Sequence, residues 1–469
     1  MKLNKKFKYM LPVLGSALIL QGCWLDDDDD DMMDVVETPS SANIRVVHAS
    51  PDAPSVDIIV GGTALASKSD LDYQDASAWF PILSNTYDIA VEANLPGDDA
   101  NVLSLSATLE GDQTYSVLAI GSVAEGTLET LIVQNAFTAV SAGSVRAQVV
   151  HAAPMAPEVD VYVTAPNTDI SSEQPLATLA YKDFTGQVEV PAGDYQIRIT
   201  PAGSTTVVFD SGSLSLDAGA DLLISATQNV VTGDSPVSLV VATGAGSATI
   251  IDAASPASLR VVHGVADAPA VDIIANNALT LVDGAPFLAA TGYLDVAADT
   301  YLIDVAADAD NSVVVIDDAE VTLEAGVFYT AIANNNLANI DLDLIVDTPR
   351  SIATAAQVRI FHASQATPAV DIYVTADGMI DDVSPAFAGV EYMEGTLSET
   401  GYVQLPAGDY VVSVTLAGSK DAAIETGTLS LEAGGIYTAF AVDGSEEGDA
   451  PQLITLDDLA APQDEMVAE

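Results

Sequence analysis

A short phrase that occurs four times constrains the fold of this chain more than any other feature. All four histidines of the 469 residues lie in it, and in each copy a proline follows the histidine by six residues and an aspartate by nine. The repeated residues are His48 and Asp57, His151 and Asp160, His263 and Asp272, and His362 and Asp371. Successive histidines are 103, 112 and 99 residues apart, so each unit has the length of a domain rather than of a solenoid repeat.

Strand signals fill each unit. A turn followed by a tyrosine-led strand recurs in every copy, and segments such as 195–200 and 410–415 alternate side chains with a period of two and are rich in Val, Ile, Thr and Tyr. A second turn, which reads Leu-acid-Ala-Gly in three units, precedes a later apolar strand. Seven or eight such strands per unit predict an all-β fold of four tandem antiparallel β-sandwich domains, immunoglobulin-like or transthyretin-like.

The repeat spacing also divides the chain into parts. We expect sandwich repeats 1 to 4 at residues 42–142, 143–253, 254–352 and 353–461, and an acidic tail at 462–469. The joints between the repeats are short and rich in small residues, so we expect the domains to follow one another end to end as an acidic rod.

The N-terminus has the features of a secreted bacterial lipoprotein. A basic stretch is followed by a mainly apolar run over 9–20, which is too short to span a bilayer, since about 20 apolar residues are needed. Gly22 before Cys23, the sole cysteine, resembles the lipobox of such proteins. We therefore expect a signal peptide at 1–22 and an acyl chain such as palmitate on Cys23.

The residues behind Cys23 predict a tether. Residues 26–31 are all aspartate, and such a like-charge block repels itself, so 23–41 is expected to be an acidic flexible segment. Trp24 directly after the cysteine resembles the pattern that favours the outer membrane over the inner one. The expected location is thus the outer membrane, lipid-anchored, with the repeats at the cell surface or on the periplasmic face.

The charge of the chain excludes one class of partner. Only 13 Lys and Arg oppose 68 Asp and Glu, for a net charge of -55. Because phosphate backbones are bound by clustered basic side chains, this balance argues against nucleic-acid binding. Scattered surface carboxylates leave weak calcium binding open.

Two interpretations of the repeated His and Asp are open. His48 and Asp57 would serve as a base and its orienting carboxylate, or as metal ligands; alternatively, the two side chains tie loop ends together by hydrogen bonds. Repetition favours the structural role, because a fold device recurs in every domain whereas an active site rarely does. We therefore assign these eight residues as a structural motif, with no catalytic residue, no metal site and no cofactor.

Other motifs of catalysis or ligand binding are missing from the sequence. It has no glycine-rich phosphate loop, no His-Glu-x-x-His and no cysteine pair. The stretch Asp308-Ala-Asp310-Asn311 is faintly similar to a calcium loop but lacks the glycine and the distal glutamate that complete such a site.

Together these phrases resemble a bacterial cell-envelope family, the domain of unknown function 4397, in four copies. The resemblance rests on His-x-x-Pro-x-x-Pro-x-Val-Asp after an Arg-Val-Val strand, on Ala-Gly-x-Tyr and on Leu-Glu-Ala-Gly-x-x-Tyr-Thr. It implies an exported, surface-attached protein and no established activity. The second unit departs from the pattern, with Gln148 in place of the arginine and Leu222 and Leu223 near the place of the tyrosine.

These patterns predict a non-enzymatic outer-membrane or cell-surface lipoprotein that serves adhesion, matrix attachment or surface structure. The alternative is a periplasmic or surface binding module for a polysaccharide or another soluble ligand. Saccharide sites commonly present aromatic platforms, and aromatic residues make up only 6% of the chain, which favours the first interpretation. An enzyme is the third possibility, which a deep pocket in a single unit would favour.

Overall fold

The computed structural model describes residues 40–64, 70–97, 99–393, 395–445 and 449–458. From residue 40 onward the chain forms one compact unit. The described residues are almost entirely strands and loops, and the helices among them are two short 3-10 turns, η2 (Ile170–Ser172) and η3 (Leu337–Asn339). The prediction of an all-β protein is confirmed.

The strands follow the repeats in chain order. The first repeat contains β1 (Ser41–His48), β2 (Val56–Val60), β3 (Thr63–Ala64), β4 (Phe80–Leu83), β5 (Asn85–Ala93), β6 (Ala100–Leu109), β7 (Gln113–Ile120) and β8 (Glu129–Ala136). The second contains β9 (Ser144–His151), β10 (Val159–Thr164), β11 (Ala177–Leu179), β12 (Val188–Pro191), β13 (Gly193–Pro201), β14 (Phe209–Leu216), β15 (Asp221–Gln228), β16 (Val237–Ala242) and β17 (Ser247–Ile250). The third contains β18 (Ala257–His263), β19 (Val271–Ala275), β20 (Leu279–Ala285), β21 (Leu294–Val296), β22 (Thr300–Ala307), β23 (Asp310–Thr322), β24 (Phe328–Asn334) and β25 (Asp341–Asp347). The fourth contains β26 (Ala356–His362), β27 (Val370–Thr375), β28 (Phe387–Val390), β29 (Ser398–Glu399), β30 (Val403–Leu405), β31 (Gly408–Leu416), β32 (Ala422–Glu425), β33 (Leu429–Leu431), β34 (Ile436–Val442) and β35 (Gln452–Asp457).

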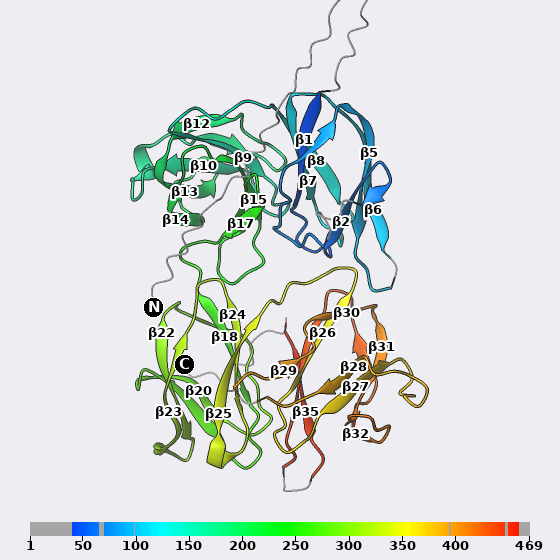
Figure 1. Cartoon of the computed structure of the whole chain (residues 1–469). Helices are drawn as coiled ribbons and strands as arrows, with labels where there is room; N and C mark the ends of the chain where they lie inside the picture. Colours follow the sequence, from blue (N-terminus) through cyan, green and yellow to red (C-terminus); the bar gives the residue numbers. More distant parts are fainter. Residues whose placement is uncertain (1–39, 65–69, 98, 394, 446–448, 459–469) are drawn as a thin grey trace, which may run out of the picture. The chain divides into compact units, whose positions relative to one another are not determined.

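Each repeat forms two sheets. In the first repeat the order is β4-β1-β7-β8 in one sheet and β3-β2-β5-β6 in the other, and Figure 1 shows the two groups of strands facing each other. The other repeats have the same plan, with the histidine-bearing strands β9, β18 and β26 in one sheet and β10, β19 and β27 in the other. The sheets are mainly antiparallel, as expected for tandem sandwiches.

One strand pair in every repeat is parallel. The histidine strand runs alongside the strand that follows the Leu-acid-Gly turn, as β1 with β7, β9 with β15, β18 with β24 and β26 with β34. The two strands are separated in the sequence by the whole second sheet, and parallel neighbours require such a long connection. The sequence pattern did not indicate this pairing, because strand periodicity carries no information about direction.

Side-chain alternation on the histidine strand decides what each face contacts. In β1, Ile44 and Val46 point into the sandwich core, where they pack with Ile58 and Val117. Arg45 and Val47 point away from that core and are nevertheless buried. A strand that is buried on both faces has cover on both, so the outer face of this sheet must pack against something else.

The cover comes from the neighbouring repeat. One cluster combines Val47 and Leu118 of the first repeat with Val150, Leu223 and Val240 of the second. A second cluster joins the third and fourth repeats through Val262, Ile332, Phe361 and Phe440. The expected end-to-end row is therefore wrong for these residues: repeats 1 and 2, and repeats 3 and 4, bury whole sheet faces against each other. We call them the first pair and the second pair.

Candidate functional site

Each repeated histidine lies at the end of the first strand of its repeat and closes the loop that follows. Its Nε2–H donates to the carbonyl oxygen of the proline six residues later, over 2.9 Å from His48 to Pro54 and from His151 to Pro157. The corresponding distance is 3.0 Å from His263 and 3.2 Å from His362. In every repeat Nδ1 accepts the backbone N–H two residues after the histidine. We call this arrangement the histidine clasp.

Burial keeps the imidazoles of the clasp neutral, although the hydrogen bond to the proline carbonyl works in the opposite direction. Burial lowers the pKa of His48 from its ordinary 6.5 to about 4, and burial likewise lowers the pKa of the histidines in the other three repeats. With Nε2 donating and Nδ1 accepting, each ring has both nitrogens engaged by the backbone. Such a histidine has no nitrogen left to accept a proton from a substrate or to bind a metal ion.

An aromatic ring packs edge-on against each imidazole. The ring centroids are 6.1 to 6.3 Å apart in the four repeats. The rings belong to Tyr73, Tyr181, Phe287 and Tyr392. The sequence did not predict these aromatic partners, because their spacing from the histidine differs between repeats and no fixed phrase marks them.

The repeated aspartates lie in the other sheet and bind the backbone of different loops. Asp57 accepts the N–H of Asp70 over 2.8 Å, and Asp160 accepts that of Gly203 over 2.7 Å. In the fourth repeat Asp371 accepts two N–H groups, those of Gly389 and Gly418, each over 2.8 Å. Within the described residues, the motif therefore forms no pair of base and orienting carboxylate; histidine and aspartate each fasten loops of their own.

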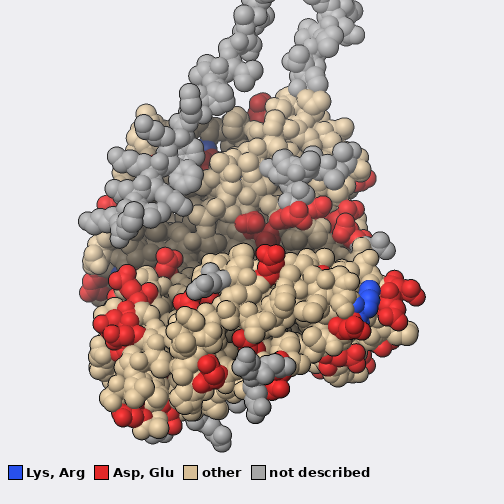
Figure 2. Space-filling view, turned by 60° about the horizontal axis from the view of Figure 1, so that its bottom comes forward, with Lys and Arg blue, Asp and Glu red and all other residues tan. Residues whose placement is uncertain are grey.

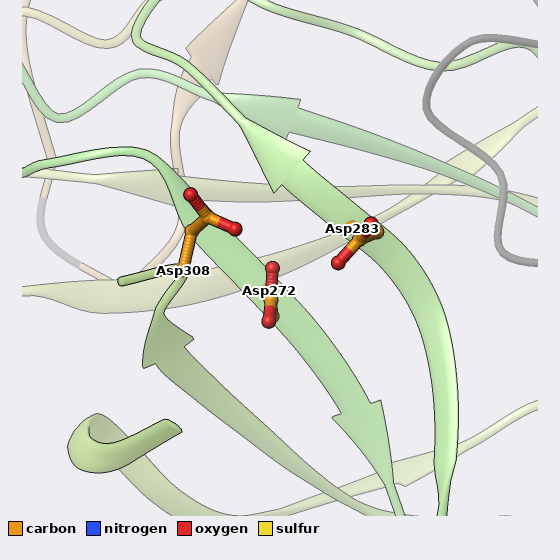
Figure 3. A group of neighbouring side chains, drawn as sticks. All are labelled: Asp272, Asp283 and Asp308. Carbon is orange, nitrogen blue, oxygen red and sulfur yellow. The ribbon is translucent and has the colours of Figure 1, made fainter. Parts of the chain in front are cut away.

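Asp272 differs from its counterparts. It is buried on β19 and accepts the N–H of Gly284 over 2.8 Å. Exposed Asp283 and Asp308 lie beside it, with one oxygen of each residue within 4.8 Å of the others (Figure 3). Asp308 belongs to the stretch that is faintly similar to a calcium loop. Oxygen ligands suit calcium, which takes about six to eight of them, but one Asp272 oxygen already accepts the N–H of Gly284, so the three carboxylates alone do not complete such a site.

The most distinctive charged group in the fold lies between repeats. Arg260 on β18 and Arg359 on β26 hold the same strand position, three residues before the histidine, and point out of their own sandwiches. Arg260 donates to Asp458 of the fourth repeat over 2.5 Å. Arg359 reciprocally donates to Asp347 at the end of β25 in the third repeat. We call this reciprocal pair of ion pairs the arginine brace.

Hydroxyl groups and rings complete the arginine brace symmetrically. Thr330 and Tyr293 donate to Asp347, and Thr438 and Tyr402 donate to Asp458. The Arg260 guanidinium lies 4.6 Å from the Tyr293 ring centre, and that of Arg359 lies 4.3 Å from the Tyr402 ring centre. Burial works against the charge of Arg260, but the nearby carboxylates outweigh it and raise its pKa. Burial raises the pKa of Asp458 despite Arg260.

The first pair has no buried ion pair at the corresponding strand positions that the structure describes; its inter-repeat ion pair, Lys182 with Glu129, is exposed. Arg45 donates to the carbonyl oxygens of Ala242 and Thr243 in the second repeat, over 3.0 and 3.1 Å, and packs 4.2 Å from the centre of the Trp79 ring. Burial lowers the pKa of Arg45 to about 10. At the reciprocal position the Gln148 oxygen accepts the side-chain N–H of Asn135 over 2.8 Å.

The surface agrees with the composition. In Figure 2 acidic side chains lie in scattered clusters over the face shown, and basic side chains are scarce. Part of the explanation is that Arg45, Arg146, Arg260 and Arg359 are buried. With Arg198, five of the eight basic residues that the structure describes are thus buried inside the fold or at the pair interfaces.

The predicted signal peptide, Cys23, most of the tether and the acidic tail lie outside the described residues. In the part of the chain that the structure covers, no helix has the length and apolar character needed to cross a membrane.

Comparison with known proteins places the chain only at the level of family. No curated protein matches it. Three solved structures are similar at low identity. The Bacillus anthracis TIE protein is 12% identical with a TM-score of 0.14, and the match covers 86% of this chain and 68% of that one. A family 26 carbohydrate-binding module of Eubacterium rectale Amy13K in complex with maltoheptaose is 10% identical with a TM-score of 0.14, covering 40% of this chain and 92% of that one, and the multi-modular glycogen-degrading pneumococcal virulence factor SpuA is 9% identical with a TM-score of 0.15, covering 80% and 37%. At these TM-scores the similarities support no conclusion about fold or function.

The family model is more informative. It matches residues 42–162, 257–373 and 375–468, which together exceed half of the chain, and leaves out most of the second repeat, the one with Gln148 and Leu222. The first two segments each begin at a histidine strand and include the histidine and the aspartate of two consecutive phrases. The chain belongs to the family described as a domain of unknown function, DUF4397.

Proposed function

We propose that this chain is a non-enzymatic envelope lipoprotein that presents paired acidic β-sandwiches for adhesion, matrix attachment or surface structure. The observation that carries the proposal is the histidine clasp. It occupies both nitrogens of every histidine, and the repeated aspartates are bound to loop amides. The polar residues that recur are thus used by the fold, and what each pair offers a partner is its acidic surface.

The N-terminal sequence supports the anchor. The small Gly22 before Cys23 and the acidic run behind it fit a lipid-attached protein whose body is held away from the membrane. The partners that fit are the membrane, through the acyl chain, and an extracellular matrix or polysaccharide; scattered carboxylates would add weak calcium binding.

Protease shaving of intact cells tests the proposal. We expect the repeats to be lost from whole cells, and a Cys23→Ser variant to remain as unprocessed, unacylated precursor. Repeats that are digested only after the outer membrane is opened would contradict surface presentation. Normal processing and membrane retention of Cys23→Ser would contradict the lipid anchor.

A further inference from the structure

The fourth sandwich contains an open pocket between its sheets. The pocket has a volume of about 310 Å³, and all the residues that line it belong to this repeat. Aliphatic and tyrosine side chains dominate its wall, among them Val358, Val412, Leu429, Leu431 and Tyr437. The volume is at the lower end of the range for small-molecule sites.

The pocket exists because the fourth core is incompletely filled. The fully buried core cluster has five residues in this repeat, against fifteen in the third. On the last strand, Thr455 lies opposite Ala439 at the position that Leu344 holds opposite Ala331 in the third repeat. The corresponding residues are Val241 in the second repeat and Ile132 in the first. Only here does a short polar side chain replace a branched aliphatic one.

A break in the opposite sheet widens the opening. In the third repeat β23 runs without interruption from Asp310 to Thr322, whereas in the fourth the corresponding segment is divided into β32 and β33. Residues that are buried in the third core are accordingly half-buried in the fourth: Tyr329 is 5% exposed, while its counterpart Tyr437 is half-buried and lines the pocket. When a ligand covers apolar surface that is in contact with water, the binding free energy becomes more favourable by about 25 cal/mol per Å².

The polar groups of the pocket define the ligand further. The hydroxyls of Ser430 and Thr455 and the carboxylate of Asp457 are part of the lining, and none of the described lining residues is basic. A negative charge at the opening, in a protein of net charge -55, disfavours anionic ligands. At roughly 30 Å³ for a water-sized group, the volume suits a ligand of about ten non-hydrogen atoms.

We propose that the pocket of the fourth sandwich binds a small amphiphile with an apolar body and a neutral or cationic polar end, such as a medium-chain alcohol or amine. The apolar body lies between Val412, Leu429 and Tyr437, and the polar end lies at Thr455 and Asp457. This site is separate from the acidic surface of the proposed function and does not depend on where the protein is located.

Binding to the full chain is measured with the neutral fluorophore 1-naphthylamine, whose size matches the pocket, with decan-1-ol, decylamine and decanoate as competitors. We expect one saturable site, displacement by the alcohol and the amine, and at least tenfold weaker displacement by decanoate. Absence of a saturable site would overturn the proposal, and equal displacement by decanoate would overturn the assigned ligand class.

Variants locate the site. Thr455→Leu introduces the leucine that the third repeat has at this position (Leu344), and Ala439→Ile introduces the isoleucine of the second repeat (Ile224). Each substitution fills the pocket and should weaken binding at least tenfold, while the circular dichroism spectrum stays unchanged. Thr206→Leu, on an exposed loop of the second repeat, is the matched control and should bind as the parent does. Undiminished binding by both filled variants would overturn the proposal. So would binding that appears only after residues 459–469 are removed, since the pocket would then be closed in the native chain.

Discussion

Gln148 and Asn135 in the first pair occupy the same strand positions as Arg359 and Asp347 in the second. The glutamine and the arginine both lie three residues before a histidine, and both contact the last strand of the neighbouring repeat. One pair uses a neutral amide bond there, and the other uses a buried ion pair. The apolar clusters that join the repeats are otherwise alike in plan.

The buried ion pair of the second pair affects its sensitivity to substitution more than its overall stability. Burying charges costs desolvation energy that the ion pair only partly returns, so the arginine brace is no proof of a more stable second pair. Loss of one partner, however, leaves an uncompensated buried charge. The second pair should therefore be far more sensitive to single substitutions at these positions than the first.

The largest expected effect follows from removal of Arg260. Arg260→Ala leaves Asp458 buried without its counter-ion and should destabilise the second pair by about 3–5 kcal/mol. Arg45→Ala is the matched change in the first pair; it leaves uncharged partners only, the Ser116 hydroxyl and the carbonyl oxygens of Ala242 and Thr243, and should cost about 1–2 kcal/mol. Denaturant unfolding of the full chain, followed by circular dichroism, measures both. Equal losses would contradict the contrast between the pairs.

Loss of Arg260 weakens the second pair more, whereas acid should weaken the first pair more. The unfolded chain binds protons at its histidines near pH 6.5, whereas folded His48 binds one only near pH 4, so stability falls as the pH falls from about 6.5 to about 4. For His48 the loss approaches about 3 kcal/mol. Asp458, whose pKa is raised by burial, takes up a proton more readily when folded, which partly offsets the histidine effect in the second pair.

Trp79 reports on this acid effect, because it packs against Arg45 at the interface of the first pair. In a Trp24→Phe background Trp79 is the sole tryptophan. Between pH 7 and pH 4.5, the midpoint of the unfolding transition that its fluorescence reports should fall more than the midpoint at which the second pair loses its β-structure. A Trp79 midpoint that does not change with pH would rule out the buried, neutral state of His48.

The histidine clasp is common to both pairs and should be of similar importance in each. His263→Ala removes the donor to Pro269 and the acceptor for the N–H of Val265, and it should lower stability by about 1–3 kcal/mol. Thr206→Ala on an exposed loop serves as the control, with little expected change. An unchanged melting temperature for His263→Ala would favour a functional role for the histidine instead of a structural one.

How far the sequence predicted the structure depends on whether a feature is local. The period-two alternation in 195–200 and the turns before it reappear as β13 and its neighbours, because strand patterning depends on which residues face a core. The repeated histidine phrase contains the histidine and the proline that form the clasp. The parallel pairing of β1 with β7 and the face-to-face pairs of repeats were not predicted, since both depend on contacts between distant segments.

The arginine brace shows the same limit. Arg260 and Arg359 were visible as a repeated arginine, but their partners lie in another repeat and share no phrase with them. Asp458 is 198 residues from Arg260, and Asp347 is only 12 residues from Arg359 but precedes it in the third repeat. The burial of Val47 and Val262, both on the outer face of a strand, was the signal that a second interface existed. A strand that is buried on both faces in every repeat indicates packing on both sides.

The smallest effect is expected from transplanting half of the brace into the first pair. Asn135→Asp and Gln148→Arg should each lower stability, since the first introduces an unpaired charge at a half-buried site and the second at a buried one. The double variant should recover about 1 kcal/mol through the new ion pair. Strictly additive losses in a double-mutant cycle would show that the two positions are not equivalent to those of Asp347 and Arg359.

Hydrogen exchange of the full-length Arg260→Ala variant tests most directly the central claim that the repeats are stabilised in pairs. The claim predicts faster exchange in β18 and β24 of the third repeat and equally in β26 and β34 of the fourth, with β1 and β9 unchanged. Faster exchange confined to the third repeat would contradict it, because the fourth repeat would then be stable without its partner.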